Sequence, residues 1–289
     1  MDISQKKEIA TNWFQKLRDE ICSQFQLLEV NYNRKNSDHI IDPKKCHFNR
    51  SKWQRDQDGS DGGYGEISIM KGNLFEKVGV NFSRVYGKFS DEFKSQIPGA
   101  SDDPNFWASG ISVVAHMQSP FIPAIHMNTR FISTTKSWFG GGTDLNPIFE
   151  NKDDTLFFHD NLKKLCDKYD KNYYEKYKKW CDDYFFIKHR NISRGVGGIF
   201  YDYLNSNNFD NDFNFTKDVG QEFLRLFTKI IHNNINKKWS DKDREYQLHK
   251  RSHYAEFNLI YDRGTKFGLM TGGNIDAILM SMPPIAKWN

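Results

Sequence analysis

The stretch ISVVAHMQSPFIPAIHMNTRFIS, from Ile111 to Ser133, contains two runs of β-favouring residues separated by a proline-rich connection. The runs Ile111–Met117 and Ala124–Ser133 are rich in apolar and β-branched side chains, which favours strands. The prolines of the QSPFIP connection cannot donate hydrogen bonds to a sheet ladder, so they suit a turn between strands. We therefore predict that these two runs form neighbouring strands.

Polar side chains recur at alternate positions in both predicted strands. Ser112 and His116 share one face of the first strand, and His126, Asn128 and Arg130 share one face of the second. If the strands pair with these faces on the same side, a hydroxyl, two imidazoles, an amide and a guanidinium gather over a small area. An arginine fork with neutral donors beside it suits a bound carboxylate. A solvated sheet face without a ligand is the alternative interpretation.

Apolar periodicity outlines the rest of the chain. Period-four spacing predicts an opening helix, and period-two spacing predicts a hairpin around Gly72 and Asn73. Further elements are expected as follows: a long helix over 156–185 with a break near Asn172, a helix over 219–230, strands over 198–203 and 255–262, and a short helix near 275–282. Few strand–helix–strand units occur. We predict an α+β protein, a single catalytic domain over residues 1–289, with a large, mainly antiparallel sheet flanked by helices on both faces.

Composition narrows the class of protein. The chain has 289 residues, and its 41 Lys and Arg against 37 Asp and Glu give a net charge of only +4, without a basic block. Nucleic acid is therefore not an expected partner. The four cysteines show no Cys-x-x-Cys spacing, which indicates reduced thiols and a cytoplasmic location. We predict neither a signal peptide nor a membrane span, because no segment approaches ~20 apolar residues.

Two glycine-rich segments and one acidic position are candidates for chemistry. Gly140–Gly142 in SWFGGGTDLNP precede Asp144 and permit close approach of a flat ligand, although a flexible turn explains them equally well. The RGVGGIF run from Arg194 lacks the third glycine and the strand-to-helix placement of a dinucleotide site, so we expect no nicotinamide or flavin cofactor. Asp262 ends the predicted strand before a glycine turn, where it either borders an active site or caps the turn.

Four motifs together resemble the oxygen-dependent coproporphyrinogen III oxidase family, with similarity from about Trp53 to the C-terminus. They are SWFGGGTDLNP (137–147), FFIKHRNISRGVGGIFYD (185–202), YDRGTKFGL (261–269) and TGGNIDAILMSMPP (271–284). The resemblance implies an enzyme of haem biosynthesis. In that reaction two propionates of coproporphyrinogen III become the vinyl groups of protoporphyrinogen IX, and molecular oxygen accepts the electrons. It also implies no organic cofactor and a homodimer formed through about Tyr254–Asn289.

The resemblance also assigns roles to individual residues. Substrate-binding positions fall on Ser112, Asn128, Thr129, Arg130, Arg263, Gly272, Gly273 and Asn274, where Asn274 replaces the usual arginine of the family. Catalytic positions fall on His126, as a proton donor, and on Asp144 and Asp262. A divalent metal would be held by His116, His126, His159 and His189, although their spacing by itself does not define a metal site.

From the residues alone, three other classes of protein remain open. A histidine-ligated non-haem iron oxygenase would require a compact facial triad. A tetrapyrrole carrier would bind the same macrocycle without consuming oxygen. An RNA-binding module would show binding that depends steeply on salt concentration.

Overall fold

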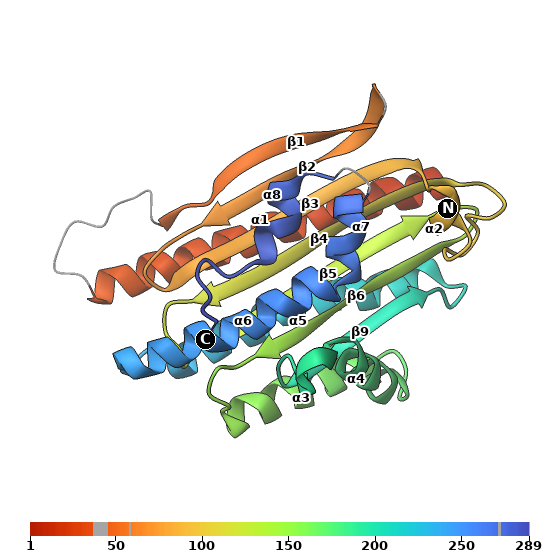
Figure 1. Cartoon of the computed structure of the whole chain (residues 1–289). Helices are drawn as coiled ribbons and strands as arrows, with labels where there is room; N and C mark the ends of the chain where they lie inside the picture. Colours follow the sequence, from red (N-terminus) through yellow and green to blue (C-terminus); the bar gives the residue numbers. More distant parts are fainter. Residues whose placement is uncertain (37–45, 58, 271–272, 289) are drawn as a thin grey trace.

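The computed structural model describes residues 1–36, 46–57, 59–270 and 273–288. Within them, seven strands form one antiparallel sheet in the order β1–β2–β3–β4–β5–β6–β9 (Figure 1). Their bounds are β1 Asn49–Gln57, β2 Ser60–Met70, β3 Phe75–Lys88, β4 Asn105–Met117, β5 Ala124–Ser133, β6 Ser137–Asn146 and β9 Gly197–Leu204. β7 (Phe186–Ile187) and β8 (Ile192–Ser193) form a separate two-stranded ribbon.

Helices cover both faces of the sheet, as predicted for this α+β protein (Figure 1). Their bounds are α1 Ile3–Asn36, α2 Asp91–Lys94, α3 Lys152–Asp167, α4 Tyr173–Tyr184, α5 Phe209–Asn234, α6 Asp241–Ile260, α7 Arg263–Met270 and α8 Ile275–Ile278, with 3-10 turns η2 Lys188–Arg190 and η3 Leu279–Ser281. α1, α3 and α5 pack on one face, α4 runs beside β9, and α6 and η3 lie over the opposite face. No helix among the described residues is long and apolar enough to cross a membrane.

The face beneath α1 and α5 carries the main hydrophobic core. Ile111, Val113 and Ala115 of β4 and Ile125 and Met127 of β5 are all buried there. Because alternate residues of a strand point to opposite faces, this apolar row leaves the intervening polar row on the other face. The period-two pattern of the sequence thus separates a core face from a second, more polar face.

Residues 255–260 are helical and Tyr261 and Asp262 follow the helix, so the predicted strand over 255–262 is wrong. α6 begins at Asp241, after the N-cap Ser240, whose capping box with Asp243 satisfies backbone N–H groups of the first turn, and it continues to Ile260. Many of its buried residues are polar, including Gln247, Arg251 and Asn258. Hydrophobic periodicity could not find this helix because its buried face is partly polar.

A buried carboxylate on α1 holds the β2–β3 turn. The Glu29 carboxylate accepts hydrogen bonds from the backbone N–H groups of Asn73 at 2.7 Å, Leu74 at 3.1 Å and Phe75 at 2.9 Å. Glu29 is completely buried, and a Cβ at Gly72 would lie 2.3 Å from its Cδ atom. Glycine is therefore needed at this predicted turn because the Glu29 side chain of α1 occupies the space that a Cβ would fill.

Replacing Glu29 with alanine removes the acceptor of three backbone donors, of which those of Leu74 and Phe75 remain buried. We expect the free energy of unfolding to fall by about 3 kcal/mol, because buried unsatisfied donors keep their full desolvation cost. Urea-induced unfolding followed by circular dichroism measures the change. Glu8→Ala, at an exposed position of the same helix, is the control, and equal unfolding midpoints for the two variants would contradict the assignment.

Candidate functional site

The register of β4 and β5 brings the predicted polar side chains to one face. Ser112 lies opposite Asn128, Val114 opposite His126, and Gly110 opposite Arg130. Residues directly opposite each other in an antiparallel pair point to the same face. Ser112, His126, Asn128 and Arg130 therefore share the face that lies away from the main core, and each is partly exposed. Thr129 points the other way and is fully buried in the core.

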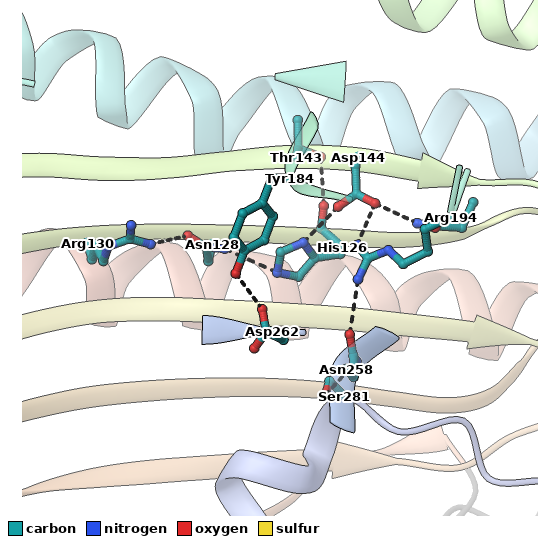
Figure 2. A network of polar contacts seen from close by, with 11 residues as sticks. His126, Asn128, Arg130, Thr143, Asp144, Tyr184, Arg194, Asn258, Asp262 and Ser281 are labelled. Atoms are coloured by element: carbon teal, nitrogen blue, oxygen red, sulfur yellow. Dashed lines mark hydrogen bonds and ion pairs between the residues drawn. The ribbon is translucent and has the colours of Figure 1, made fainter. Parts of the chain in front are cut away.

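A chain of hydrogen bonds runs along this face (Figure 2). Arg130 donates from Nη1 to Asn128 Oδ1 at 3.0 Å, and Asn128 Nδ2 lies 3.2 Å from His126 Nε2. His126 Nδ1 lies 2.8 Å from Asp144 Oδ1 on the adjacent strand β6. Because arginine can only donate and an ionised carboxylate can only accept, Asn128 donates to Nε2 and Nδ1 carries the hydrogen. The chain therefore fixes His126 as a neutral imidazole protonated on Nδ1.

Asp144 also forms a buried ion pair with Arg194. Arg194 Nη2 lies 2.6 Å from Asp144 Oδ2, and each side chain is only 2% exposed. Asn146 Nδ2 donates to the same oxygen at 2.8 Å. Burial alone would raise the pKa of Asp144, but the charge of Arg194 and the hydrogen bond from His126 outweigh it and lower the pKa to about 2. Asp144 is therefore a permanently ionised anchor for His126.

The guanidinium of Arg194 is enclosed by aromatic rings. Its Cζ atom lies 3.9 Å from the ring centre of Phe185, 4.6 Å from that of Tyr254 and 4.8 Å from that of Phe257. Its Nη1 atom donates to Asn258 Oδ1 on α6 at 3.1 Å. Aromatic faces stabilise a desolvated cation, and the amide and carboxylate take two of its donors. Arg194 thus joins the sheet to α6 (Figure 2).

Sequence reasoning gave Arg194 no role. It sits in a segment with several basic residues, and neither periodicity nor spacing distinguishes it from its exposed neighbours Lys188, His189 and Arg190. What sets Arg194 apart is that three aromatic rings, from the segments before β7 and along α6, surround it in space.

Asp262 lies on the opposite side of the site, between α6 and α7. Its Oδ2 atom accepts from the backbone N–H of Thr265 at 2.6 Å, so the carboxylate caps α7 and does not end a strand. Tyr184 donates its hydroxyl to Asp262 Oδ1 at 2.9 Å. The Arg263 guanidinium lies 5.0 Å from the centre of the Tyr184 ring. Asp262 and Arg263 are therefore neighbours on one wall.

The remaining predicted substrate positions lie around α8. The side chain of Asn274 accepts from the backbone N–H of Ala277 at 2.9 Å and caps this short helix. The backbone N–H of Gly273 donates to Gly268 O at 2.9 Å, and Gly272 lies outside the described residues. At the position where the family usually has an arginine, the Asn274 side chain therefore serves as a helix cap.

The three glycines of SWFGGGTDLNP lie inside strand β6 instead of in a ligand-binding loop or a flexible turn. A Cβ at Gly141 would lie 2.6 Å from Asn128 O, and one at Gly142 would lie 2.2 Å from Ile199 O. The strand needs glycine here because neighbouring backbones and side chains pass close to it. Its glycines are buried, so they serve packing within the sheet.

The four predicted metal ligands do not assemble into one site. His116 Nε2 lies 2.9 Å from Ser281 O, and His126 is engaged as described above. His159 bonds to Tyr174 OH and Val196 O, while His189 bonds to Tyr261 OH and Glu256. No group of three or more His, Cys, Asp or Glu side chains among the described residues is placed to hold a metal ion. These residues do not fit the metal that the resemblance implied.

A cavity of about 220 Å³ lies beyond Arg194, at the end of the polar row. Its lining includes His116, Asn146, Arg194 and Tyr254, together with residues of α6. It does not include Ser112, Asn128 or Arg130, and it is smaller than typical sites for drug-sized ligands, at about 300 Å³ or more. This cavity is therefore separate from the polar face that we assign to substrate.

Comparison with known proteins decides the family. A family model described as "Coproporphyrinogen III oxidase" matches residues 9–289. The chain belongs to this family. It is 54% identical over 284 residues to the "Oxygen-dependent coproporphyrinogen-III oxidase" of Rickettsia bellii (strain OSU 85-389), covering 98% of this chain and 99% of that protein. The same name is given to relatives in Rickettsia rickettsii (strain Sheila Smith), 54% identical over 285 residues, and Rickettsia peacockii (strain Rustic), 53% identical over 285 residues, each covering 99% of both chains.

Membership of the coproporphyrinogen III oxidase family agrees with the resemblance drawn from the four motifs. The name of its relatives makes molecular oxygen the co-substrate of those enzymes. In this chain, the two motifs that contain Asp144 and Arg194 meet at the buried ion pair. The YDRG motif contacts the same region through the hydrogen bond between Asp262 and Tyr184.

The buried histidine His116 gives the site a pH-dependent contribution to stability. Burial and then the charge of Arg251 lower the pKa of His116 to about 3. Below its ordinary pKa the unfolded chain takes up a proton that the folded chain does not. The contribution is therefore complete above about pH 6.5 and falls towards pH 3 by about 1.4 kcal/mol per pH unit.

We expect His116→Asn to flatten the decline in unfolding free energy between pH 6 and pH 4. Urea unfolding at pH 6, 5 and 4 measures the slope, and His232→Asn, at an exposed position of α5, is the control. Parallel profiles for wild type and His116→Asn would show that this imidazole does not titrate as its burial requires.

Proposed function

We propose that the protein catalyses the oxygen-dependent oxidative decarboxylation of two propionates of coproporphyrinogen III, which yields protoporphyrinogen IX in haem biosynthesis. The observation that carries this proposal is the placement of Ser112, Asn128 and Arg130 on one partly exposed face, within a chain that matches the family over 9–289. A carboxylate-bearing macrocycle requires cationic and amide anchors of this kind.

The propionate that reacts is bound at Arg130. Its guanidinium donates bidentately to a carboxylate, while the Asn128 amide and the Ser112 hydroxyl are neighbouring donors. Phe200, whose ring centre lies 6.0 Å from Arg130 Cζ, supplies apolar surface beneath the macrocycle. Arg263 on the opposite wall provides a second cation where Asn274 cannot.

Asp262 is the carboxylate that contacts the reacting ring. As the pyrrole loses electrons, positive charge develops, and a nearby carboxylate that accepts the pyrrole N–H stabilises that charge. Asp144 cannot take this role, because only 2% of its side chain is exposed and its oxygens are engaged by His126, Arg194 and Asn146, whereas Asp262 is partly exposed. Asp144 therefore acts through His126.

The chemistry balances with oxygen as the only oxidant. One hydrogen leaves the propionate β-carbon with its electron pair, the bond to the carboxylate carbon breaks, and a vinyl group and carbon dioxide result. Oxygen accepts the hydrogen, the electron pair and one proton, which gives hydrogen peroxide. We assign the delivery of that proton to His126. Its Nε2 takes the proton from water when the hydrogen bond from Asn128 opens, and the Asp144 carboxylate, 2.8 Å from Nδ1, stabilises the imidazolium.

An oxygen-electrode assay with coproporphyrinogen III tests the function, with porphyrin fluorescence read after oxidation. We expect Arg130→Ala to raise KM tenfold or more, since a lost charged hydrogen bond costs about 1.5–3 kcal/mol. Asp262→Ala should mainly lower kcat. Arg225→Ala, an exposed arginine paired with Glu222 on α5, is the control.

Two outcomes of this assay would overturn the proposals. A wild-type protein that binds the macrocycle without consuming oxygen would be a carrier. Kinetics unchanged in both Arg130→Ala and Asp262→Ala would remove the site assignment.

The proposal includes a homodimer formed through the C-terminal segment of about 254–289. Support comes from large apolar side chains that are exposed along this part of the chain. They are Leu259, Ile260, Leu269, Met270, Ile275, Ile285 and Trp288, each between 45% and 63% exposed. A concentration of exposed apolar side chains is typical of an interaction surface.

Sedimentation velocity at micromolar concentration tests the dimer. We expect the wild type to sediment as a dimer and the double variant Met270→Asp/Ile275→Asp to sediment as a monomer, because two buried carboxylates would oppose association. Leu156→Asp, at an exposed apolar position of α3, is the control and should remain dimeric. A wild type that is monomeric under these conditions would contradict the proposal.

The proposal also places the protein in the cytoplasm. Cys22, Cys166 and Cys181 are buried free thiols, and burial raises the pKa of Cys22 to about 11 and that of Cys166 to about 12. Reduced, unreactive cysteines of this kind are typical of a reducing compartment.

A further inference from the structure

Strand β9 contains an irregularity beside Arg130. Gly141 of β6 pairs with Tyr201 and Phe139 pairs with Leu204, so two residues of β9, Asp202 and Tyr203, oppose Gly140 alone. Tyr203 has φ 56°, in the left-handed region that a bulky residue rarely adopts. A β-bulge with such a residue re-aims a neighbouring side chain, and strained positions of this kind cluster at functional sites.

The side chain that this bulge places is Asp202. Its Oδ2 atom lies 2.9 Å from Arg130 Nη2, and its Oδ1 atom accepts from the backbone N–H of Tyr203 at 3.1 Å. A Cβ at Gly140 would lie 2.5 Å from Asp202 Oδ1 and 2.9 Å from Arg130 Nε. The first glycine of the triple run therefore leaves room for this ion pair above the sheet.

Two partners then fix the guanidinium of Arg130. Asn128 accepts a hydrogen bond from Nη1 and Asp202 accepts one from Nη2, which leaves three of the five N–H donors for another ligand. Arg130 is 28% exposed and Asp202 is 14% exposed. Burial would lower the pKa of Arg130, and the adjacent Asp202 charge outweighs this effect and raises it. The arginine is thus held charged and oriented at a partly open surface.

A purely structural ion pair would not account for this arrangement. Tyr203 is 45% exposed, so its strained backbone is not needed to bury its ring. Exposed or partly exposed ion pairs contribute only about 0–1 kcal/mol to stability. The bulge, the strained backbone of Tyr203 and the glycine together destabilise the fold by more than such an ion pair stabilises it. A functional need for a fixed orientation of Arg130 explains why they are nevertheless present.

We propose that Asp202 is a positioning residue. It holds the Arg130 guanidinium so that the remaining N–H donors of Arg130 bind the substrate propionate in the same orientation during both decarboxylations. This inference rests on the proposed function. Removing two carboxylates in succession passes through a tricarboxylate intermediate, whose second propionate must reach the same place. A guanidinium free to swing would bind a carboxylate and yet present the propionate in the wrong geometry, which costs rate more than affinity.

The test compares Asp202→Ala and Asp202→Asn with wild type in the oxygen-electrode assay, with the tricarboxylate intermediate separated chromatographically after oxidation. For Asp202→Ala we expect kcat to fall about tenfold to a hundredfold, KM to change less than threefold, and the intermediate to accumulate. Asp202→Asn keeps an oxygen that accepts from Arg130 Nη2 but loses the negative charge, so its kcat should lie between those of the other two proteins, twofold to fivefold below wild type.

Two further variants separate positioning from packing. Gly140→Ala should also lower kcat, and should raise KM as well, because its methyl group would lie 2.5 Å from Asp202 Oδ1 and 2.9 Å from Arg130 Nε and would displace both members of the ion pair. Asp183→Ala removes a carboxylate paired with Lys179 on the exposed face of α4 and should match wild type. Thermal unfolding of each variant shows that it is folded.

Wild-type kcat and intermediate levels in Asp202→Ala would overturn the inference, and so would a rise in KM alone. If Asp202→Ala does not fold, Asp202→Asn decides: a twofold to fivefold lower kcat with accumulated intermediate supports positioning, and wild-type behaviour opposes it. Failure of the proposed function would be seen separately, as a wild type that takes up no oxygen with coproporphyrinogen III.

Discussion

The buried ion pair between Asp144 and Arg194 is the contact around which the site is organised. It joins strand β6 of the sheet to the segment before β9, and through Asn258 it reaches α6 on the outer side. Moving two charges out of water costs several kcal/mol for each ion, so such a pair persists only when other contacts compensate. The aromatic rings around Arg194 and the hydrogen bond from His126 to Asp144 provide that compensation.

From this pair a polar row extends across the sheet to a second ion pair. Asp144 fixes His126, Asn128 lies between His126 and Arg130, and Asp202 holds the far end of Arg130. The row is closed to solvent at the Asp144 end and partly open at the Arg130 end. The closed end sets the tautomer of His126, and the open end presents oriented donors to a substrate carboxylate.

Part of the site followed directly from strand periodicity. The alternation within Ala124–Ser133 placed Asn128 and Arg130 on one face, and the same rule would have placed Thr129 in the core, where it lies. Among the described residues the four histidines do not come together as a metal site, because motif similarity assigns roles without distances. His116 and His126 share a sheet face, yet each is engaged by protein groups from other elements.

The sequence by itself determined the α+β class, the β4–β5 pair and the family, because these depend on short-range alternation and on long motifs. Tertiary structure alone decided that Arg194 is buried and Asp202 faces Arg130, and that α6 is a helix. Each of these depends on polar or aromatic partners that are distant in sequence or displaced by a bulge. Local periodicity records which face a side chain takes, but not which charge it will meet there.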